Sequence, residues 1–143
     1  MSDIWKPNPR FRPELDAAIN EGVNAYYITL SKALREQLSK RGTGRTYRRG
    51  RGRVRQRSAP GQPPSPDTGE LRRSWLVGKA AKSITMNPDL VSLRFGSRLH
   101  YARIDGGYGR VKPRPYIRPT LDSIAELFPV TIARAIKKTI RSK

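Results

Sequence analysis

Apolar side chains in the first third of the chain recur at steps of three and four residues, which places them on one face of a helix. These positions are Leu15, Ile19, Val23, Tyr27, Leu30, Leu34 and Leu38. Pro13 suits the first turn of a helix, and Gly42 suits its end. The pattern predicts a long amphipathic helix over residues 13–40, preceded by an extended tail over residues 1–12. Gly22 lies inside the helix and weakens it by about 1 kcal/mol relative to alanine.

The end of the chain shows the same helical spacing. Its apolar positions are Leu121, Ile124, Ala125, Phe128, Ile132, Ala135, Ile136 and Ile140. Within residues 112–143, a proline-rich turn is expected first and a helix from about Pro119 onward. Pro129 interrupts the pattern, and proline inside a helix removes a backbone donor, so we expect a kink or a restart there.

Residues 67–111 contain short runs of the kind that form strands. A helical turn leads into a first strand at Trp75–Val77, and Ser83–Met86 and Leu90–Phe95 are further strands. Tyr101–Asp105 is another short regular piece. The predicted fold class is α+β in a single domain, with both helices packed on a small antiparallel β-meander and with an extended arginine-rich loop.

That loop lies between the first helix and the strands, over residues 41–66. Its first part, Arg41–Arg57, holds eight arginines, several glycines and no acidic residue, and it shows neither helical nor strand periodicity. Such a segment buries too little apolar surface to offset its ordering entropy, so we expect a mobile arm. The second part, Ser58–Pro66, is rich in proline and is expected to be non-regular.

Charge narrows the choice of partners. The chain has 143 residues, with 30 basic against 11 acidic side chains and a formal net charge of +19. This excess favours binding to nucleic acid, to an anionic membrane or to an acidic protein surface. The chain has no cysteine, no signal peptide is apparent, and no apolar run reaches the roughly 20 residues that span a bilayer. We therefore expect a soluble protein without a membrane partner, in a cytoplasm or in a particle assembled there.

Candidate catalytic chemistry is sparse. His100 is the single histidine, and no carboxylate or hydroxyl partner lies at a motif spacing from it. Asp67 and Glu70 are better interpreted as helix-entry residues than as an acid–base pair. No cluster has the spacing of metal ligands, and neither glycine-rich stretch continues as a phosphate loop. The sequence predicts a protein that is not an enzyme and has no cofactor.

Three blocks of sequence point to a family. The first is Ser58-Ala59-Pro60-Gly61-Gln62-Pro63-Pro64, continued by Asp67-Thr68-Gly69-Glu70-Leu71-Arg72-Arg73-Ser74. The second is Tyr101-Ala102 followed by Ile104-Asp105-Gly106-Gly107, and the third is Pro113-Arg114-Pro115-Tyr116-Ile117-Arg118-Pro119-Thr120-Leu121. Their order and spacing closely resemble the neck or tail-completion family of long-tailed bacteriophages, relatives of the lambda minor tail protein Z. The resemblance covers about residues 55–125. The family usually has glutamate where Asp105 stands and phenylalanine where Tyr116 stands.

The resemblance implies a function. It implies a small α+β structural protein of the virion, assembled in the host cytoplasm, which forms a ring at the head–tail junction around the DNA passage. Its partners would be further copies of itself, as a hexamer first and a dodecamer second. They would also include the head-closure or connector protein on one side and the tail-terminator or tail-tube protein on the other, with possible contact to packaged double-stranded DNA. The alternative, based on charge alone, is a basic nucleic-acid-binding protein without sequence specificity.

Two sets of residues are the candidate contacts. The arm offers a partner or DNA the side chains of Arg41, Arg45, Arg48, Arg49, Arg51, Arg53, Arg55 and Arg57. Docking between subunits is assigned to Ser58, Ala59, Pro60, Gly61, Pro63, Pro64, Arg114, Pro115 and Tyr116. A long, glycine-broken arm suits grooves between protein subunits slightly better than DNA. Tyr47 and Val54 give it little capacity to read or stack on bases.

Overall fold

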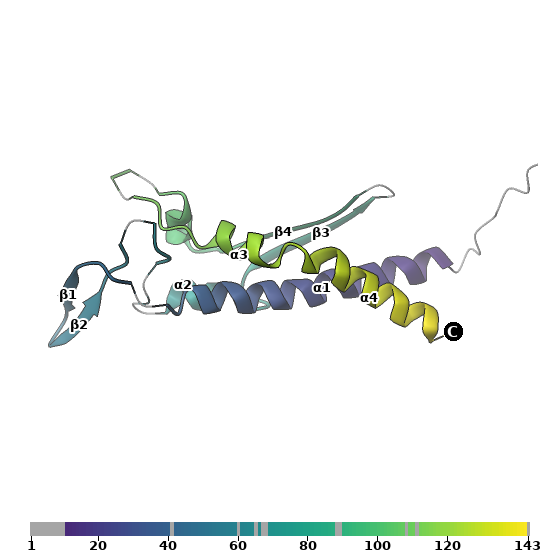
Figure 1. The fold of residues 1–143 in the computed structure, drawn as a ribbon, viewed down its shortest axis with the longest axis horizontal. Helices are drawn as coiled ribbons and strands as arrows, with labels where there is room; N and C mark the ends of the chain where they lie inside the picture. The colour runs from purple at the N-terminus through teal and green to yellow at the C-terminus, as the bar shows by residue number, and fades with distance from the viewer. Residues whose placement is uncertain are drawn as a thin grey trace, which may run out of the picture.

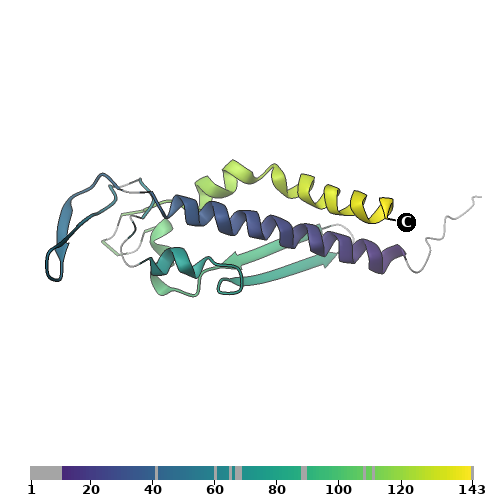
Figure 2. The ribbon, with the colours of Figure 1, turned by 90° about the horizontal axis from the view of Figure 1, so that it is seen from below.

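A computed structural model describes residues 11–40, 42–59, 61–64, 66, 69–87, 90–107, 109–110 and 112–142. It confirms the α+β class. Helix α1 (Phe11–Gln37) runs along an elongated molecule, and helices α3 (Ile117–Ile124) and α4 (Leu127–Arg141) lie along one side of it (Figure 1). Helix α2 and strands β3 and β4 lie on the other side, so that α1 is the middle layer (Figure 2). Among the described residues, no helix is long and apolar enough to cross a membrane.

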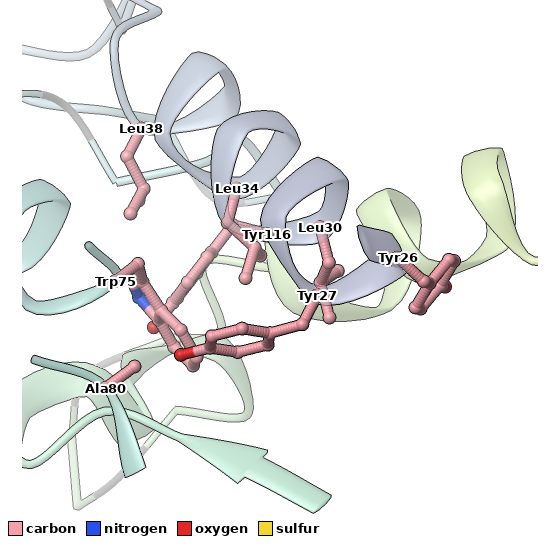
Figure 3. Packing of buried hydrophobic residues seen from close by; sticks show 8 residues of the cluster. All are labelled: Tyr26, Tyr27, Leu30, Leu34, Leu38, Trp75, Ala80 and Tyr116. Carbon is pink, nitrogen blue, oxygen red and sulfur yellow. The ribbon is translucent and has the colours of Figure 1, made fainter. Parts of the chain in front are cut away.

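The core forms on the face of α1 that the sequence predicts. Val23, Tyr27, Leu30 and Leu34 are buried, as is Leu38 directly after the helix, whereas Leu15 and Ile19 near its start are only half-buried. The central cluster consists of Tyr26, Tyr27, Leu30, Leu34, Leu38, Trp75, Ala80 and Tyr116 (Figure 3). Burial of each large apolar side chain contributes about 1.5–3 kcal/mol. The core therefore joins α1 to segments that are far from it in sequence.

Aromatic side chains bridge the three layers. The Trp75 ring lies edge-on to the rings of Phe95 and Tyr116, with ring centroids 5.9 Å and 6.1 Å away. On the side of the C-terminal helices, Tyr26 meets Phe128 in the same geometry at 4.9 Å. Each edge-to-face pair of this kind contributes about 0.5–1.5 kcal/mol of stability beyond the contribution of the apolar area that it buries.

Pro129 restarts the C-terminal helix, as expected. Helix α3 ends at Ile124, and α4 begins at Leu127, two residues before the proline. Proline has no backbone donor for the carbonyl of Ala125, four residues earlier, and its ring clashes with that carbonyl. The N–H of Phe128 bonds to the Ala125 carbonyl instead, at 3.2 Å. The break lets α3 and α4 both stay in contact with α1.

Gly22 lies where α1 packs closely against α4. It is buried, and a Cβ placed on it would lie 2.7 Å from the Cα of Ile132 and 3.3 Å from the Cβ of Ala135. No side chain fits in that space without moving the backbone of α4. Gly22 is thus more than a weak point of the helix, because it permits the close crossing of the two long helices.

The expected meander is a single hairpin. Strands β3 (Ala81–Asn87) and β4 (Leu90–Gly96) pair antiparallel, with Ile84 opposite Leu93. Lys82 lies against α1, where its Nζ donates to Asn24 Oδ1 at 2.5 Å and sits 5.2 Å from the centre of the Tyr27 ring.

The strand predicted at Trp75–Val77 is wrong. Helix α2 (Glu70–Ser74) continues there into turns, in which Leu76 N–H bonds to the Arg73 carbonyl at 3.1 Å. The turns bury Trp75, whose carbonyl accepts a hydrogen bond from Ser31 Oγ of α1. Burial of the indole among core side chains therefore outweighs the strand preference of this segment.

Two further elements complete the fold. The 3₁₀ helix η1 (His100–Asp105) confirms the short regular piece expected at Tyr101–Asp105. The arm contains strands β1 (Thr46–Arg49) and β2 (Arg53–Gln56), which form a second hairpin. This β1–β2 hairpin extends beyond the C-terminal end of α1, at the end of the molecule opposite the chain's C-terminus (Figure 1).

Candidate functional site

The arginine-rich arm is folded, which corrects the expectation of a non-regular loop. Tyr47 pairs with Arg55 and Arg48 with Val54 across the β1–β2 hairpin. The connection Gly50-Arg51-Gly52 has positive φ at both glycines, 65° and 89°, a backbone that other residues adopt only with strain. A glycine-containing three-residue loop between two short runs is a hairpin signal, and that signal was present in the sequence.

The base of the hairpin is closed against the segment that follows it. The Gly44 N–H donates to the Arg57 carbonyl at 2.7 Å, and the Arg57 N–H donates to the Arg45 carbonyl at 3.0 Å. Gly42 and Gly44 pass so near residues Arg57 and Ser58 that a Cβ on either glycine would fall within 3 Å of their backbone. The glycines at the base are therefore required by close packing.

Gln62 secures the base, a role that the sequence did not reveal. Its Oε1 accepts the N–H groups of Thr43 and Ala59 at 3.0 Å and 2.9 Å. Its Nε2 donates to Thr43 Oγ1 at 2.8 Å. One side-chain amide thus joins the two chain segments that enter and leave the arm.

The described arginines of the arm are placed as follows. The Arg57 guanidinium lies over the Tyr47 ring, 4.7 Å from its centre. Arg45, Arg48 and Arg51 are exposed, and Arg55 is half-buried. Arg41 and the side chains of Arg49 and Arg53 lie outside the described part of the structure, which gives only the backbone pairing of the latter two.

The proline-rich segment lies against its own chain. Ser58 is buried beside Gly42, and the Gly61 N–H donates to the Pro113 carbonyl at 3.4 Å. Ala59, Pro63 and Pro64 are half-buried, and Pro60 lies outside the described residues. Docking of this segment on a neighbouring subunit stays a prediction.

Hydrogen bonds join the second sequence block, which includes Asp105, to the third, which includes Tyr116 and Ile117. Asp105 Oδ1 accepts the N–H groups of Tyr116 and Ile117 at 2.7 Å and 2.8 Å, and thereby caps the start of α3. Tyr116 is fully buried; its hydroxyl donates to the Ala102 carbonyl at 3.0 Å, and burial raises its pKa.

Of the residues assigned to docking in this block, Tyr116 has no surface left to offer a neighbour, and its side chain belongs to the core. Arg114 and Pro115 are half-buried, and the Arg114 N–H donates to the Ile104 carbonyl at 2.9 Å.

A basic groove lies between the last turns of α1 and helix α2. It has a volume of about 450 Å³ and is lined by Lys32, Arg35, Glu36, Ser39, Arg72, Arg73 and Leu76. The lining of the groove thus contains four cationic side chains and one carboxylate. Arg72 Nη1 donates to Ser39 Oγ at 3.1 Å, which ties the two walls together. Sequence reasoning missed this groove because its walls are about 35 residues apart in the chain and meet only in the fold.

The chemistry available in these surfaces is binding through cations. Within the described residues, no group of three or more His, Cys, Asp or Glu side chains could hold a metal ion. The side chain of His100, the one histidine considered above, is outside the described part of the structure.

Comparison of the chain with protein-family models, with curated proteins and with solved structures gives no match. The resemblance to the phage neck family therefore rests on the three sequence blocks alone.

Proposed function

We propose that this protein is a structural component of a phage neck, in which it forms a ring that joins the head-closure side to the tail and surrounds the DNA passage. The order and spacing of the three sequence blocks carry this proposal. Support comes from the contact of Asp105 with Tyr116, because it joins the second block to the third and fixes the start of α3. The residues that resemble the family thus include those that organise the fold.

The proposed ring is a hexamer of elongated subunits, matching the sixfold symmetry of tails, with a dodecamer as the second choice. In this arrangement the protein acts by contact and not by catalysis. Of the residues assigned to docking, those available for contact with a neighbouring subunit are the exposed Gly61 and the half-buried Ala59, Pro63, Pro64, Arg114 and Pro115.

The test is to image lysates of a phage that lacks the gene for this protein. The expected result is filled heads and finished tails that remain unjoined, and supply of the intact protein restores joined particles. Joined, infectious particles in the absence of the protein would contradict the proposal.

The net charge of +19 favours a second candidate, a free basic nucleic-acid-binding protein. The two functions differ in where the protein is found. A neck component co-purifies with virions at a fixed copy number per particle, whereas a free binding protein stays in the lysate supernatant with host nucleic acid.

A further inference from the structure

We infer that the β1–β2 hairpin and the groove between α1 and α2 form one site for the sugar–phosphate backbone of duplex DNA. The site binds without sequence specificity. The inference deepens the proposed function, since packaged DNA is the duplex that a neck ring encloses, and it rests on that function only for its setting.

The order within the arm bears on the kind of partner. A mobile arm can mould itself into a groove between protein subunits, which favours a protein partner. The arm is instead a hairpin with a closed base, held by Gln62 and by the bonds between Gly44, Arg45 and Arg57. Because its backbone is already paired, the hairpin can present its arginines without a large ordering cost on binding.

The hairpin offers few apolar anchors to a protein partner. Stable protein–protein contacts depend on buried aromatic and aliphatic side chains at their centre. Residues 46–56 supply only two such side chains, Tyr47 and Val54. Arg57 already lies over one face of the half-buried Tyr47 ring, and Val54, which is 60 % exposed, lies on the opposite face of the hairpin. The surface is therefore cationic without an apolar centre, which suits a polyanion better than a protein.

The scarcity of aromatic side chains in the arm favours duplex over single-stranded nucleic acid. Proteins that bind single strands stack the bases on exposed aromatic rings. The cation–π contact of Arg57 occupies one face of Tyr47, and no other aromatic residue lies in residues 41–66. Phosphate contacts without stacking are the mode in which proteins hold duplex DNA regardless of its sequence.

The position of the groove places further cations near the arm. Lys32, Arg35, Arg72 and Arg73 line it beside the C-terminal half of α1. The β1–β2 hairpin projects beyond the same end of that helix (Figure 1). No carboxylate occurs between Arg41 and Pro66, so Glu36 is the one acidic side chain that lines the groove or lies in the arm. The basic surface thus continues from the arm onto the body of the protein.

The test measures binding of the purified full-length protein to a short blunt duplex as a function of NaCl concentration. The arm variant is Arg48→Gln with Arg51→Gln, and the groove variant is Lys32→Gln with Arg73→Gln; all four side chains are exposed. The control removes the same charge from exposed positions of α4, as Arg134→Gln with Lys137→Gln. Thermal unfolding of each variant verifies that the fold is unchanged.

Each phosphate contact contributes about 0.9 to the slope of log K against log [NaCl]. We expect the slope to become shallower by about 2 in the arm variant and again in the groove variant, and to stay unchanged in the control. An equal decrease of this slope in all three variants would overturn the inference, because net charge alone would then explain binding. Wild-type slopes in the arm and groove variants would overturn it too.

A competition experiment separates DNA from an acidic protein. If poly-L-glutamate displaces the duplex as well as unlabelled duplex does at equal charge, the site is a general acidic-partner surface and the inference is wrong. Failure of these binding tests leaves the head–tail joining defect of the gene deletion unaffected, so the two proposals can fail independently.

Discussion

The carboxylate of Asp105 and the backbone N–H of Tyr116 are joined by a hydrogen bond of 2.7 Å. Asp105 ends the 3₁₀ helix η1, and Tyr116 directly precedes α3, so a single side chain links the two segments. The same oxygen accepts the N–H of Ile117 at 2.8 Å. The first N–H groups of a helix have no partner within it, and here a residue distant in sequence supplies one.

Replacement of Asp105 tests this cap. Asp105→Ala leaves two backbone donors without their acceptor and should lower the free energy of unfolding by about 1–2 kcal/mol. Asp105→Asn keeps one acceptor oxygen and should lower the free energy of unfolding by a smaller amount. Urea unfolding gives both values, and Asp122→Ala, an exposed change in α3, serves as the control. An alanine variant as stable as the wild type would show that the cap contributes nothing.

Gly22→Ala separates helix propensity from packing. Propensity alone predicts that alanine stabilises the helix by about 1 kcal/mol. The added Cβ would lie 2.7 Å from the Ile132 Cα, and such overpacking costs about 1–3 kcal/mol, so we expect no gain or a net loss of stability.

The matched control for Gly22→Ala is Ala25→Gly, at an exposed position of the same helix, which should cost about 1 kcal/mol through propensity. A melting temperature raised by Gly22→Ala would contradict the close crossing of α1 and α4.

Gln62→Ala should loosen the arm without unfolding the body. The variant loses two bonds from backbone donors and one to Thr43 Oγ1. Hydrogen exchange should therefore speed up at the amides of Gly44 and Arg57, while the amides of α1 near Leu30 stay protected. Gln62→Glu retains the two acceptor contacts and should give an intermediate effect. Unchanged exchange at the base of the arm would disprove the role of Gln62.

High pH should destabilise the protein through Tyr116. Burial raises the pKa of this phenol above its ordinary value of 10.0, so the folded state keeps the proton that the unfolded state loses. The stabilising contribution of the neutral phenol is complete below pH 10 and is lost as pH rises further, by up to about 1.4 kcal/mol per pH unit. Unfolding by urea between about pH 8 and pH 11 measures the loss.

Tyr116→Phe is the matched variant for this titration. It removes the proton and should flatten the pH dependence above pH 10, although Tyr26 and Tyr27, whose pKa values burial also raises, still contribute. At neutral pH it should cost about 1 kcal/mol through the lost bond to Ala102. Identical pH profiles of the two proteins would show that Tyr116 does not titrate differently on folding.

The helices could be predicted from the sequence because their signal is local. Side chains three and four residues apart share a face of α1 whatever lies elsewhere in the chain, and Pro129 affects the backbone directly before it. The strand wrongly assigned to Trp75–Val77 had only local preference in its favour. The packing of Trp75 on Phe95 and Tyr116, which decided its conformation, is a tertiary contact.

The arm shows a different limit of sequence reasoning. The two apolar residues of its strands, Tyr47 and Val54, lie on opposite faces of the hairpin, so neither strand shows the alternation of apolar and polar residues that marks a half-buried sheet. Arginine occurs on both faces of the hairpin and obscures the two-residue period that is typical of strands. The clamp by Gln62 and the groove between α1 and α2 depend on residues far apart in the chain, and their assembly could be seen only in the structure.

The chain's C-terminus and the β1–β2 hairpin lie at opposite ends of the molecule (Figure 1). An affinity tag or a fluorescent label fused after residue 143 would therefore sit far from the arginines of the β1–β2 hairpin. Such fusions can immobilise the protein with the β1–β2 hairpin facing the solution, and in the proposed ring the label would reveal which way each subunit points along the DNA passage.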